Sequence, residues 1–529
     1  MKKAIRSRIA STSITLLLAL AGILWLSASS AQNIRQPGVA GSFYPADARS
    51  LSAMIDEMLS HTSQPPITGQ ILAVVAPHAG YQFSGPVAAY TYSALKGRTY
   101  SRVVIIAPSH YEAFGFSSVF EGDAYATPLG NVPVDKAFAK QLVQANTSIQ
   151  FSSHGHSPTH DGAEHAVEVE LPWLQRVLGR FEVVPIVMGD QSYESSRALG
   201  VALAKLIRSN DTLIVASSDL SHYHPYDEAV SQDRKTLNAL QAWDYFSMSG
   251  NFAARIWEAC GGAPIVAAMI AAERMGANQA SLLKYANSGD TSGDHSRVVG
   301  YSAVALVKTP VQSPEEKSFS LKEAEKDELL ALARKSVEYA VQESKAYEPL
   351  PSADESLNQE RGAFVTLKKS GELRGCVGYT SAIKPLYLTV RDTATLAALR
   401  DTRFSPVSVS ELPQLEYEIS VLSPLRRVMD VHEIRIGLHG LLMKNADHQG
   451  LLLPQVPIEE KWNRETFLDQ TCVKAGMRRG CWKDEGTDIF VFTAVVFGES
   501  KPHAVMQEPS STPSPVVSPG PPEPGSGRR

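Results

Sequence analysis

The stretch Ile71-Leu-Ala-Val-Val-Ala-Pro-His78 sets the pattern for the first half of the chain, because a short apolar run ends directly in a histidine. Three further apolar runs of similar length follow at 103–107, 183–187 and 212–216. All four are rich in β-branched residues and bounded by Pro, Gly, Ser or Asp, which favours buried strands over buried helices. Amphipathic stretches separate them, and 297–307 has the composition of a closing strand. We therefore predict an α/β domain, a sheet flanked by helices, over 32–308.

Potential ligands follow the ends of three of these runs. His78 comes just after the first run, His110 just after the second, and Asp219 and His222 follow the fourth. In an open α/β sheet the carboxyl ends of parallel strands line one crevice, and this crevice is where ligands bind. We therefore expect these four side chains to converge in space, although they lie far apart along the chain.

The residue types at these positions suit a transition metal. Two neutral imidazoles supply two corners of a site, and a third, anionic ligand completes a facial set with open positions for water or substrate. Cys260 is the candidate for the third ligand, since it is a lone cysteine followed by two glycines that permit close backbone approach. The pattern predicts a metal site formed by His78, His110 and Cys260.

Each of these residues also has a purely structural interpretation. A histidine at a strand end can cap a helix or satisfy backbone groups, and Cys260 can be an ordinary buried thiol. Asp219 can be a helix N-cap. The convergence of two histidines at strand ends favours the metal site.

The composition limits the classes of function. With 529 residues, 43% of them hydrophobic and 20% charged, the chain can bury at least two cores. The formal net charge is −5, and the sequence shows no concentrated basic face of the kind that binds phosphates. We therefore expect no nucleic-acid partner.

The N-terminus has the order of regions that is typical of a secretory signal peptide. A basic start precedes an apolar run at 14–26, and small residues follow at 27–31. The apolar run has 13 residues, whereas a bilayer span needs about 20. We predict that 1–31 is cleaved and that the protein is exported to the periplasm or the extracellular space. An uncleaved leader would instead anchor it to a membrane.

A second domain follows a linker at 309–319 that contains Pro, Ser and charged residues. A charged helical period at 321–342 and strands at 362–367 and 416–422 indicate an α+β domain over 320–500. The tail 501–529 is mostly Pro, Ser and Gly and is predicted to be disordered.

Cysteine usage agrees with export but does not require it. Four cysteines are too few for a disulfide framework in a chain of this length. Export would allow one bridge, and Cys472 and Cys481 are the closest pair in sequence.

The motifs around the candidate ligands resemble those of the Memo family. They occur in the family's order from about Arg35 to Lys308: His78-Ala-Gly-Tyr81, Ala107-Pro-Ser-His110, Glu164-His165-Ala-Val-Glu168, Ser218-Asp-Leu-Ser-His222 and Cys260-Gly-Gly262. The resemblance implies a fold similar to class III extradiol dioxygenases, in which two His and one Glu hold Fe(II). In the Memo family a cysteine takes the place of the glutamate, so His78, His110 and Cys260 are the implied ligands. A thiolate favours copper, zinc or iron.

The same resemblance places Asp219 and His222 close to the metal, with His165 and Glu168 as further site candidates. We hypothesise a metal-dependent, dioxygenase-like oxidoreductase, with a hydrolase less favoured, that acts on a small-molecule or peptide substrate. His222 would be the general acid/base, and Asp219 would orient it or support the metal from outside its ligands. The alternative is a non-catalytic metal-binding or protein-interaction module on a dioxygenase-like fold.

The second domain resembles the AMMECR type, a family that implies no specific chemistry. The matching motifs are Leu373-Arg-Gly-Cys-Val-Gly-Tyr379, Asp401-Thr-Arg-Phe-Ser-Pro406, Gly450-Leu-Leu-Leu-Pro-Gln455 and Cys472-Val-Lys-Ala-Gly476. Arg374, Cys376 and Arg403 could form a cationic, thiol-bearing pocket, since a nearby guanidinium lowers the pKa of a thiol. Alternatively, Cys376 fills a small buried position and Arg403 pairs with a carboxylate.

Both domains resemble components of the bacterial AmmeMemoRadiSam system, its B and A proteins. That resemblance implies a radical-SAM protein as a partner. A leader for export conflicts with a cytosolic partner, so the two expectations exclude each other.

Overall fold

The computed structural model describes residues 32–63, 65–159, 163–309, 320–380, 382–428, 430–445, 448–484 and 486–499. The predicted leader, nearly all of the predicted linker and the predicted tail lie outside the described residues. Within the described part, no helix has the length and apolar character needed to cross a membrane. The chain divides into two compact units, of which the first comprises Met1–Phe319, Ser381–Ile383 and Leu422–Ala494 and the second comprises Ser320–Thr380, Lys384–Val421 and Val495–Arg529.

The described residues of the first unit build a nine-stranded sheet in the order β10-β12-β2-β9-β3-β8-β4-β7, with β11 paired to β12. Its centre contains four parallel strands, which are β2 (Gln70–Ala76), β9 (Thr212–Ser217), β3 (Arg102–Pro108) and β8 (Glu182–Met188). Strand β12 (Val298–Lys308) pairs with β2 and runs antiparallel to it. These are the five strands that the apolar runs predict. Their near-continuous burial is what a sheet covered on both faces requires.

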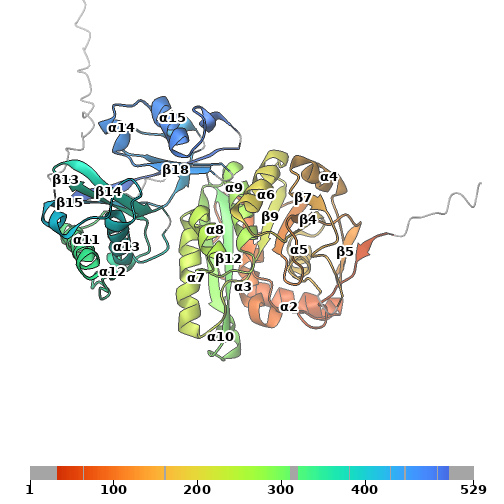
Figure 1. Cartoon of the computed structure of the whole chain (residues 1–529). Coiled ribbons are helices and arrows are strands. Elements are labelled where there is room, and N and C mark those ends of the chain that lie inside the picture. Colours follow the sequence, from red (N-terminus) through yellow and green to blue (C-terminus); the bar gives the residue numbers. More distant parts are fainter. Residues whose placement is uncertain are drawn as a thin grey trace, which may run out of the picture. The chain divides into compact units, whose positions relative to one another are not determined.

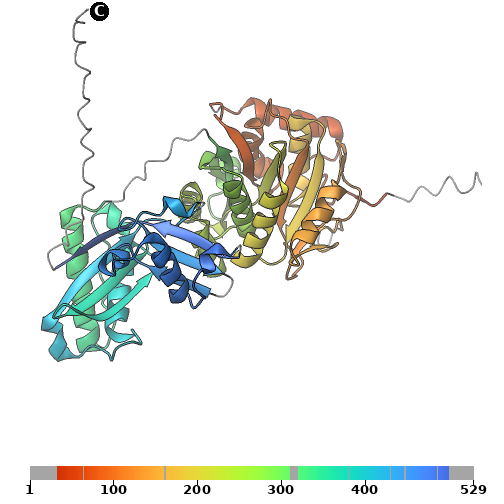
Figure 2. The ribbon, with the colours of Figure 1, turned by 90° about the horizontal axis from the view of Figure 1, so that it is seen from above.

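Helices cover both faces of this sheet (Figures 1 and 2). Alternate residues of β3, namely Val103, Ile105 and Ala107, lie in one core with side chains of α2 (Ala48–Ser60), α3 (Tyr81–Ser93) and α5 (Leu171–Leu178). Helix α9 (Gly262–Arg274) lies on β2, β3 and β9 and packs against α6 (Tyr193–Leu206). Strand alternation sends neighbouring side chains to opposite faces, so each strand contributes to both layers.

The remaining elements of this half are short strands and helices around the sheet. Strands β1 (Ile34–Arg35), β5 (Ala124–Thr127) and β6 (Gly130–Pro133) form a separate small sheet. The others are β4 (Ser117–Val119), α4 (Lys136–Ala145), β7 (Ile149–Phe151), the 3₁₀ helix η1 (Glu168–Glu170), β10 (His222–His224), α7 (Tyr226–Gln241), α8 (Tyr245–Ala253), β11 (Gln279–Asn287) and α10 (Ser288–Ser292).

The C-terminal half contains two four-stranded sheets with helices, which confirms the α+β expectation. One sheet has the order β14-β13-β15-β20, and the other, which belongs to the first unit, has the order β16-β19-β17-β18. The elements around the former are α11 (Glu323–Glu343), α12 (Glu355–Asn358), β13 (Ala363–Lys369), β14 (Glu372–Tyr379), α13 (Leu386–Leu399), η2 (Val409–Gln414), β15 (Leu415–Leu422) and β20 (Ala494–Gly498). Those around the latter are β16 (Arg426–Arg427), η3 (Val431–Glu433), β17 (Gly440–Asn445), β18 (His448–Leu452), α14 (Val456–Glu459), α15 (Arg464–Lys474), η4 (Cys481–Lys483) and β19 (Asp488–Phe492).

A disulfide joins Cys472 on α15 to Cys481 on η4, with Cα atoms 5.8 Å apart. This is the pair that lies closest in sequence. Cys260 and Cys376 are free.

Candidate metal centre

The carboxyl ends of three central strands bring the first candidate ligands together. β9 lies between β2 and β3 and runs parallel to both, so all three end at the same edge of the sheet. His78 follows β2, His110 follows β3, and Asp219 follows β9. The rings of His78 and His110 meet edge to face, with centroids 5.1 Å apart.

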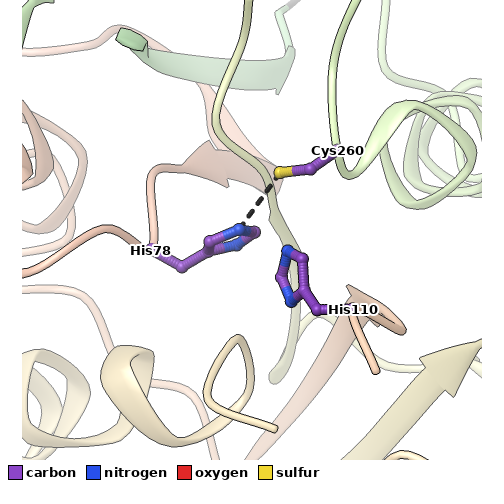
Figure 3. Close-up of side chains that lie close together, drawn as sticks. All are labelled: His78, His110 and Cys260. Carbon is purple, nitrogen blue, oxygen red and sulfur yellow. Dashed lines mark hydrogen bonds between the residues drawn. The ribbon is translucent and has the colours of Figure 1, made fainter. Parts of the chain in front are cut away.

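Cys260 reaches this edge from the loop before α9. Its Sγ lies 3.1 Å from His78 Nε2, and the three side chains point toward one another (Figure 3). One ligand atom from each of His78, His110 and Cys260 lies within 4.8 Å of the other two. The predicted trio therefore converges.

A glycine makes this approach possible. A Cβ on Gly261 would lie 2.3 Å from the carbonyl oxygen of Ser217, much closer than any Cβ can come, so only glycine fits after the cysteine. The Gly261 N–H also donates to Ser218 Oγ at 3.0 Å, which ties the cysteine loop to the end of β9.

His110 is held by a buried carboxylate. Its Nδ1 lies 2.9 Å from Glu164 Oε1, and its backbone N–H donates to Glu164 Oε2 at 2.7 Å. Burial lowers the pKa of His110, but the hydrogen bond and charge of Glu164 outweigh it and raise that pKa above its ordinary value. Burial likewise raises the pKa of Glu164, and the contacts with His110 outweigh it and lower that pKa. A carboxylate on Nδ1 leaves Nε2 as the ligand atom, as in many metal-bound histidines.

His78 is held in a comparable way by a hydroxyl. Its Nδ1 lies 2.8 Å from Ser217 Oγ, and its backbone N–H donates to Asp219 Oδ1 at 2.9 Å. The residue is only 2% exposed, and burial lowers the pKa of His78 well below its ordinary value. His78 is therefore neutral at physiological pH, which is the form that binds metals.

The cysteine thiol is protonated in the metal-free protein. Burial and the nearby Asp219 carboxyl raise the pKa of Cys260. The backbone N–H of Asp219 donates to the sulfur at 3.2 Å. A metal would have to displace this proton, because the thiolate is the ligand form.

Asp219 and His222 both lie at this edge, and within the described part of the chain no hydrogen bond or ion pair joins them. The carboxyl of Asp219 comes within 4.0 Å of His78 Nε2, and burial raises the pKa of Asp219 to about 7. His222 opens β10, and its Nδ1 lies 2.8 Å from the carbonyl of Leu220, so this carbonyl orients the ring. Burial lowers the pKa of His222, and the charge of His110 lowers it further. Since β10 follows Asp219, this residue does not cap a helix.

The two other candidates of the first domain have different surroundings. The His165 ring stacks on His110 with centroids 4.8 Å apart, and its buried Nδ1 has no hydrogen-bond partner in the described residues. Burial lowers the pKa of His165 to about 4. His110, Glu164 and His165 form a second group whose potential ligand atoms lie within 4.8 Å of one another.

Glu168, in contrast, anchors the start of the described chain. Its carboxylate pairs with Arg35 Nη1 at 2.5 Å, accepts from the backbone of Gly38 and Val39, and accepts from the hydroxyl of Tyr44. Because both carboxylate oxygens of Glu168 accept hydrogen bonds from protein groups, Glu168 stabilises the fold and has no free oxygen for a ligand.

The predicted cationic pocket of the second domain is neutralised by carboxylates. Arg374 makes a two-point contact with Glu411 at 3.0 and 3.1 Å, and Arg403 pairs with Asp401 at 2.7 Å. Burial raises the pKa of Cys376, and this outweighs the lowering effect of Arg403. The geometry favours the structural interpretation of Cys376 over a reactive thiol.

Sequence reasoning missed the residues that hold the two histidines. Glu164 precedes His165 in a motif already singled out, and Ser217 directly follows the predicted strand 212–216 and is the last residue of the observed β9. Only their position next to recognised residues could have pointed to them, since neither Glu nor Ser is unusual in sequence.

The fold and the ligand set define a mixed α/β protein with a candidate metal centre at the ends of its central strands. A profile of Memo-like proteins matches residues 35–305, and an AMMECR1 profile matches 330–497. A MEMO1 family protein of Methanopyrus kandleri is 40% identical over 285 residues, which cover 51% of this chain and 98% of that protein. A MEMO1 family protein of Nitrosopumilus maritimus is 35% identical over 279 residues, which cover 52% of this chain and 100% of that protein.

The solved structure of an uncharacterized protein from Pyrococcus horikoshii matches this chain with 36% sequence identity and a TM-score of 0.34. The match covers 35% of this chain and 96% of that protein's chain. From the family match, the chain belongs to the Memo-like proteins, and its Memo-like domain is followed by an AMMECR1 domain. Both expected resemblances are thereby confirmed.

Proposed function

We propose that this protein binds one transition-metal ion through His78 Nε2, His110 Nε2 and Cys260 Sγ and works as a metal-dependent oxidoreductase related to class III non-haem dioxygenases. One observation carries the proposal. The Nδ1 atoms of both histidines are taken up by Ser217 and Glu164, so both free Nε2 atoms and the sulfur are available to one ion. This donor set fits copper, iron or zinc.

The residues around the ligands supply the acid/base chemistry. A bound ion would polarise a substrate oxygen or carry electrons, depending on whether it is zinc or a redox-active metal. His222 stays neutral because burial lowers its pKa, and the hydrogen bond from Nδ1 to Leu220 leaves Nε2 free to accept a proton. Asp219 supports His78 from outside the ligand set, through the backbone N–H of that histidine.

Elemental analysis of purified protein tests the metal site. Wild-type protein is expected to hold close to one ion per chain, and Cys260→Ser is expected to lose most of it because a hydroxyl is a poor replacement for a thiolate. Cys376→Ser is the matched control, since it removes the other free cysteine and leaves the site intact. Equal metal content in wild type and Cys260→Ser would overturn the proposed ligand set.

The catalytic part needs its own measurement. His222→Ala is expected to retain the metal while losing turnover of dioxygen with a panel of small phenolic substrates, followed with an oxygen electrode. Loss of metal in this variant would make His222 a ligand instead. A wild-type protein that holds metal without an exchangeable water would favour a non-catalytic binding module.

We also propose that the protein works outside the cytoplasm. The disulfide between Cys472 and Cys481 supports export, because such bonds persist mainly in oxidising compartments. N-terminal sequencing of protein from the periplasm tests it, with a mature end after residue 31 as the expected result. Protein recovered only from the cytoplasm, with both thiols free, would favour the radical-SAM partnership instead.

A further inference from the structure

A buried glutamate, Glu170, lies behind His78, and the side chain of Ser217 lies between the two. Glu170 is on η1 and is fully buried. Its Oε1 lies 2.7 Å from Ser217 Oγ, and its Oε2 accepts a hydrogen bond from the hydroxyl of Tyr92. None of its described contacts is with a cationic side chain, which is unusual for a buried carboxylate.

The protons around Ser217 can be counted. Three groups lie within hydrogen-bond distance of its Oγ, namely Glu170 Oε1 at 2.7 Å, the carbonyl of Ala166 at 2.7 Å and His78 Nδ1 at 2.8 Å. The hydroxyl has one proton to give and can accept two. The carbonyl can only accept, so the hydroxyl proton goes there, and Glu170 and His78 must both donate to the serine oxygen.

We propose that Glu170 is a positioning residue for the metal site. As a neutral acid it donates a hydrogen bond to Ser217 Oγ, and this oxygen also accepts a hydrogen bond from Nδ1–H of His78. His78 is thereby held as the Nδ1–H tautomer, and its Nε2 is left to face Cys260. The inference rests on the proposed function for its consequence, metal affinity. Its structural part, the tautomer, can be measured without any metal.

Two further observations agree with this arrangement. Burial raises the pKa of Glu170 to about 8, so the neutral acid is the main form at neutral pH. On the other side of the ring, Cys260 Sγ lies 3.1 Å from His78 Nε2 (Figure 3). The Nδ1–H tautomer leaves Nε2 with a lone pair directed toward this sulfur and toward an ion held by it.

The test compares Glu170→Gln with Ser217→Ala in the full chain. A glutamine keeps both roles, since its amide N–H₂ donates to Ser217 and its oxygen accepts from Tyr92. Spectra of protein labelled with ¹⁵N-histidine report the tautomer of His78, and a His78→Gln variant assigns its signals. We expect the Nδ1–H form in the metal-free wild type and in Glu170→Gln, and a shift toward the other tautomer in Ser217→Ala.

Zn²⁺ affinity, measured by competition with a chelator, gives the functional readout. Ser217→Ala is expected to bind Zn²⁺ about 10–100-fold more weakly, and Glu170→Gln to stay within about threefold of wild type. Infrared difference spectra of wild type against Glu170→Gln are expected to show the C=O band of a protonated carboxyl group. The absence of that band, or an Nε2–H form of His78 in the wild type, would overturn the proposal.

These outcomes separate the two proposals. If the wild type binds no metal but shows the Nδ1–H tautomer and the carboxyl band, the proposed function fails while the role of Glu170 in positioning His78 stands. If the wild type binds the metal but the tautomer of His78 is unchanged in Ser217→Ala, the proposed function stands and the role of Glu170 in positioning His78 fails.

Discussion

The substitution Gly261→Ala tests how closely the cysteine loop must approach the sheet. An alanine Cβ would lie 2.3 Å from the carbonyl oxygen of Ser217 and 2.5 Å from the Cβ of Ser218. Neither atom is the far end of a flexible side chain, so the backbone itself must move. The Gly261 backbone has φ −99° and ψ 34°, which alanine tolerates, so steric overlap and not backbone strain sets the cost.

The magnitude follows from two opposing effects. Forcing one extra carbon into a packed region costs about 1–3 kcal/mol. Replacing glycine also reduces the conformational freedom of the unfolded chain, which returns about 0.4–1 kcal/mol. We therefore expect a net loss of roughly 1.3 kcal/mol of stability in urea unfolding, from the midpoints of those two ranges. Metal affinity should fall about 10–100-fold, since the loop carries Cys260 away from His78.

Gly250→Ala is the matched control. Gly250 lies within α8, its backbone φ is not positive, and a Cβ there would meet nothing within 4 Å. The change should stabilise the protein by about 0.5–1 kcal/mol and leave metal binding unchanged. The reasoning is refuted if Gly261→Ala unfolds at the same urea concentration as wild type and binds metal equally well, because the loop would then have room that the structure does not show.

Three further outcomes are expected. Glu164→Gln should weaken metal binding about 10–100-fold because it disturbs the support of His110, as a titration with Zn²⁺ would measure. In the metal-free protein this pair stabilises the fold most between about pH 4.5 and 6.5. Because the pKa of His110 is raised in the fold, its contribution to stability is lost as the pH rises above that window and the imidazolium loses its proton. Because the pKa of Glu164 is lowered, its contribution is lost as the pH falls below the window and the carboxylate is protonated. Melting curves of wild type and Glu164→Gln should therefore differ most inside this window and converge on either side. Reduction of the Cys472–Cys481 bond, which closes a loop of 9 residues, should cost roughly 2–3 kcal/mol in unfolding of the C-terminal half, and unchanged unfolding with dithiothreitol would contradict it.

Much of the fold follows from local sequence pattern. The four parallel strands could be predicted because apolar, β-branched runs of this length have few other stable conformations in a buried layer. The prediction that His78 and His110 meet also needed only the rule that parallel strands end at one edge. The strand order was not predictable, because β9 lies between β2 and β3 although it follows both in sequence.

The residues that support the site could not be predicted from local sequence pattern. A glutamate before His165 has no local property that distinguishes it from Glu168, yet Glu164 holds His110 and Glu168 holds Arg35. Similarly, the guanidinium groups of Arg374 and Arg403 suggest an activated thiol in sequence. In the fold, burial of Cys376 raises its pKa and outweighs Arg403. Both guanidinium groups are paired, Arg374 with Glu411 from a distant segment and Arg403 with the nearby Asp401.

The sequence by itself determined the strands, the two kinds of domain and the identity of His78, His110 and Cys260 as candidate ligands, because these depend on residue type and short-range periodicity. Only the tertiary structure decided which nitrogen of each histidine is free, which carboxylates are neutral or paired, and how near the sulfur comes. Those properties depend on burial and on contacts between residues far apart in the chain, such as His78 with Ser217, and distance along a sequence carries no information about them.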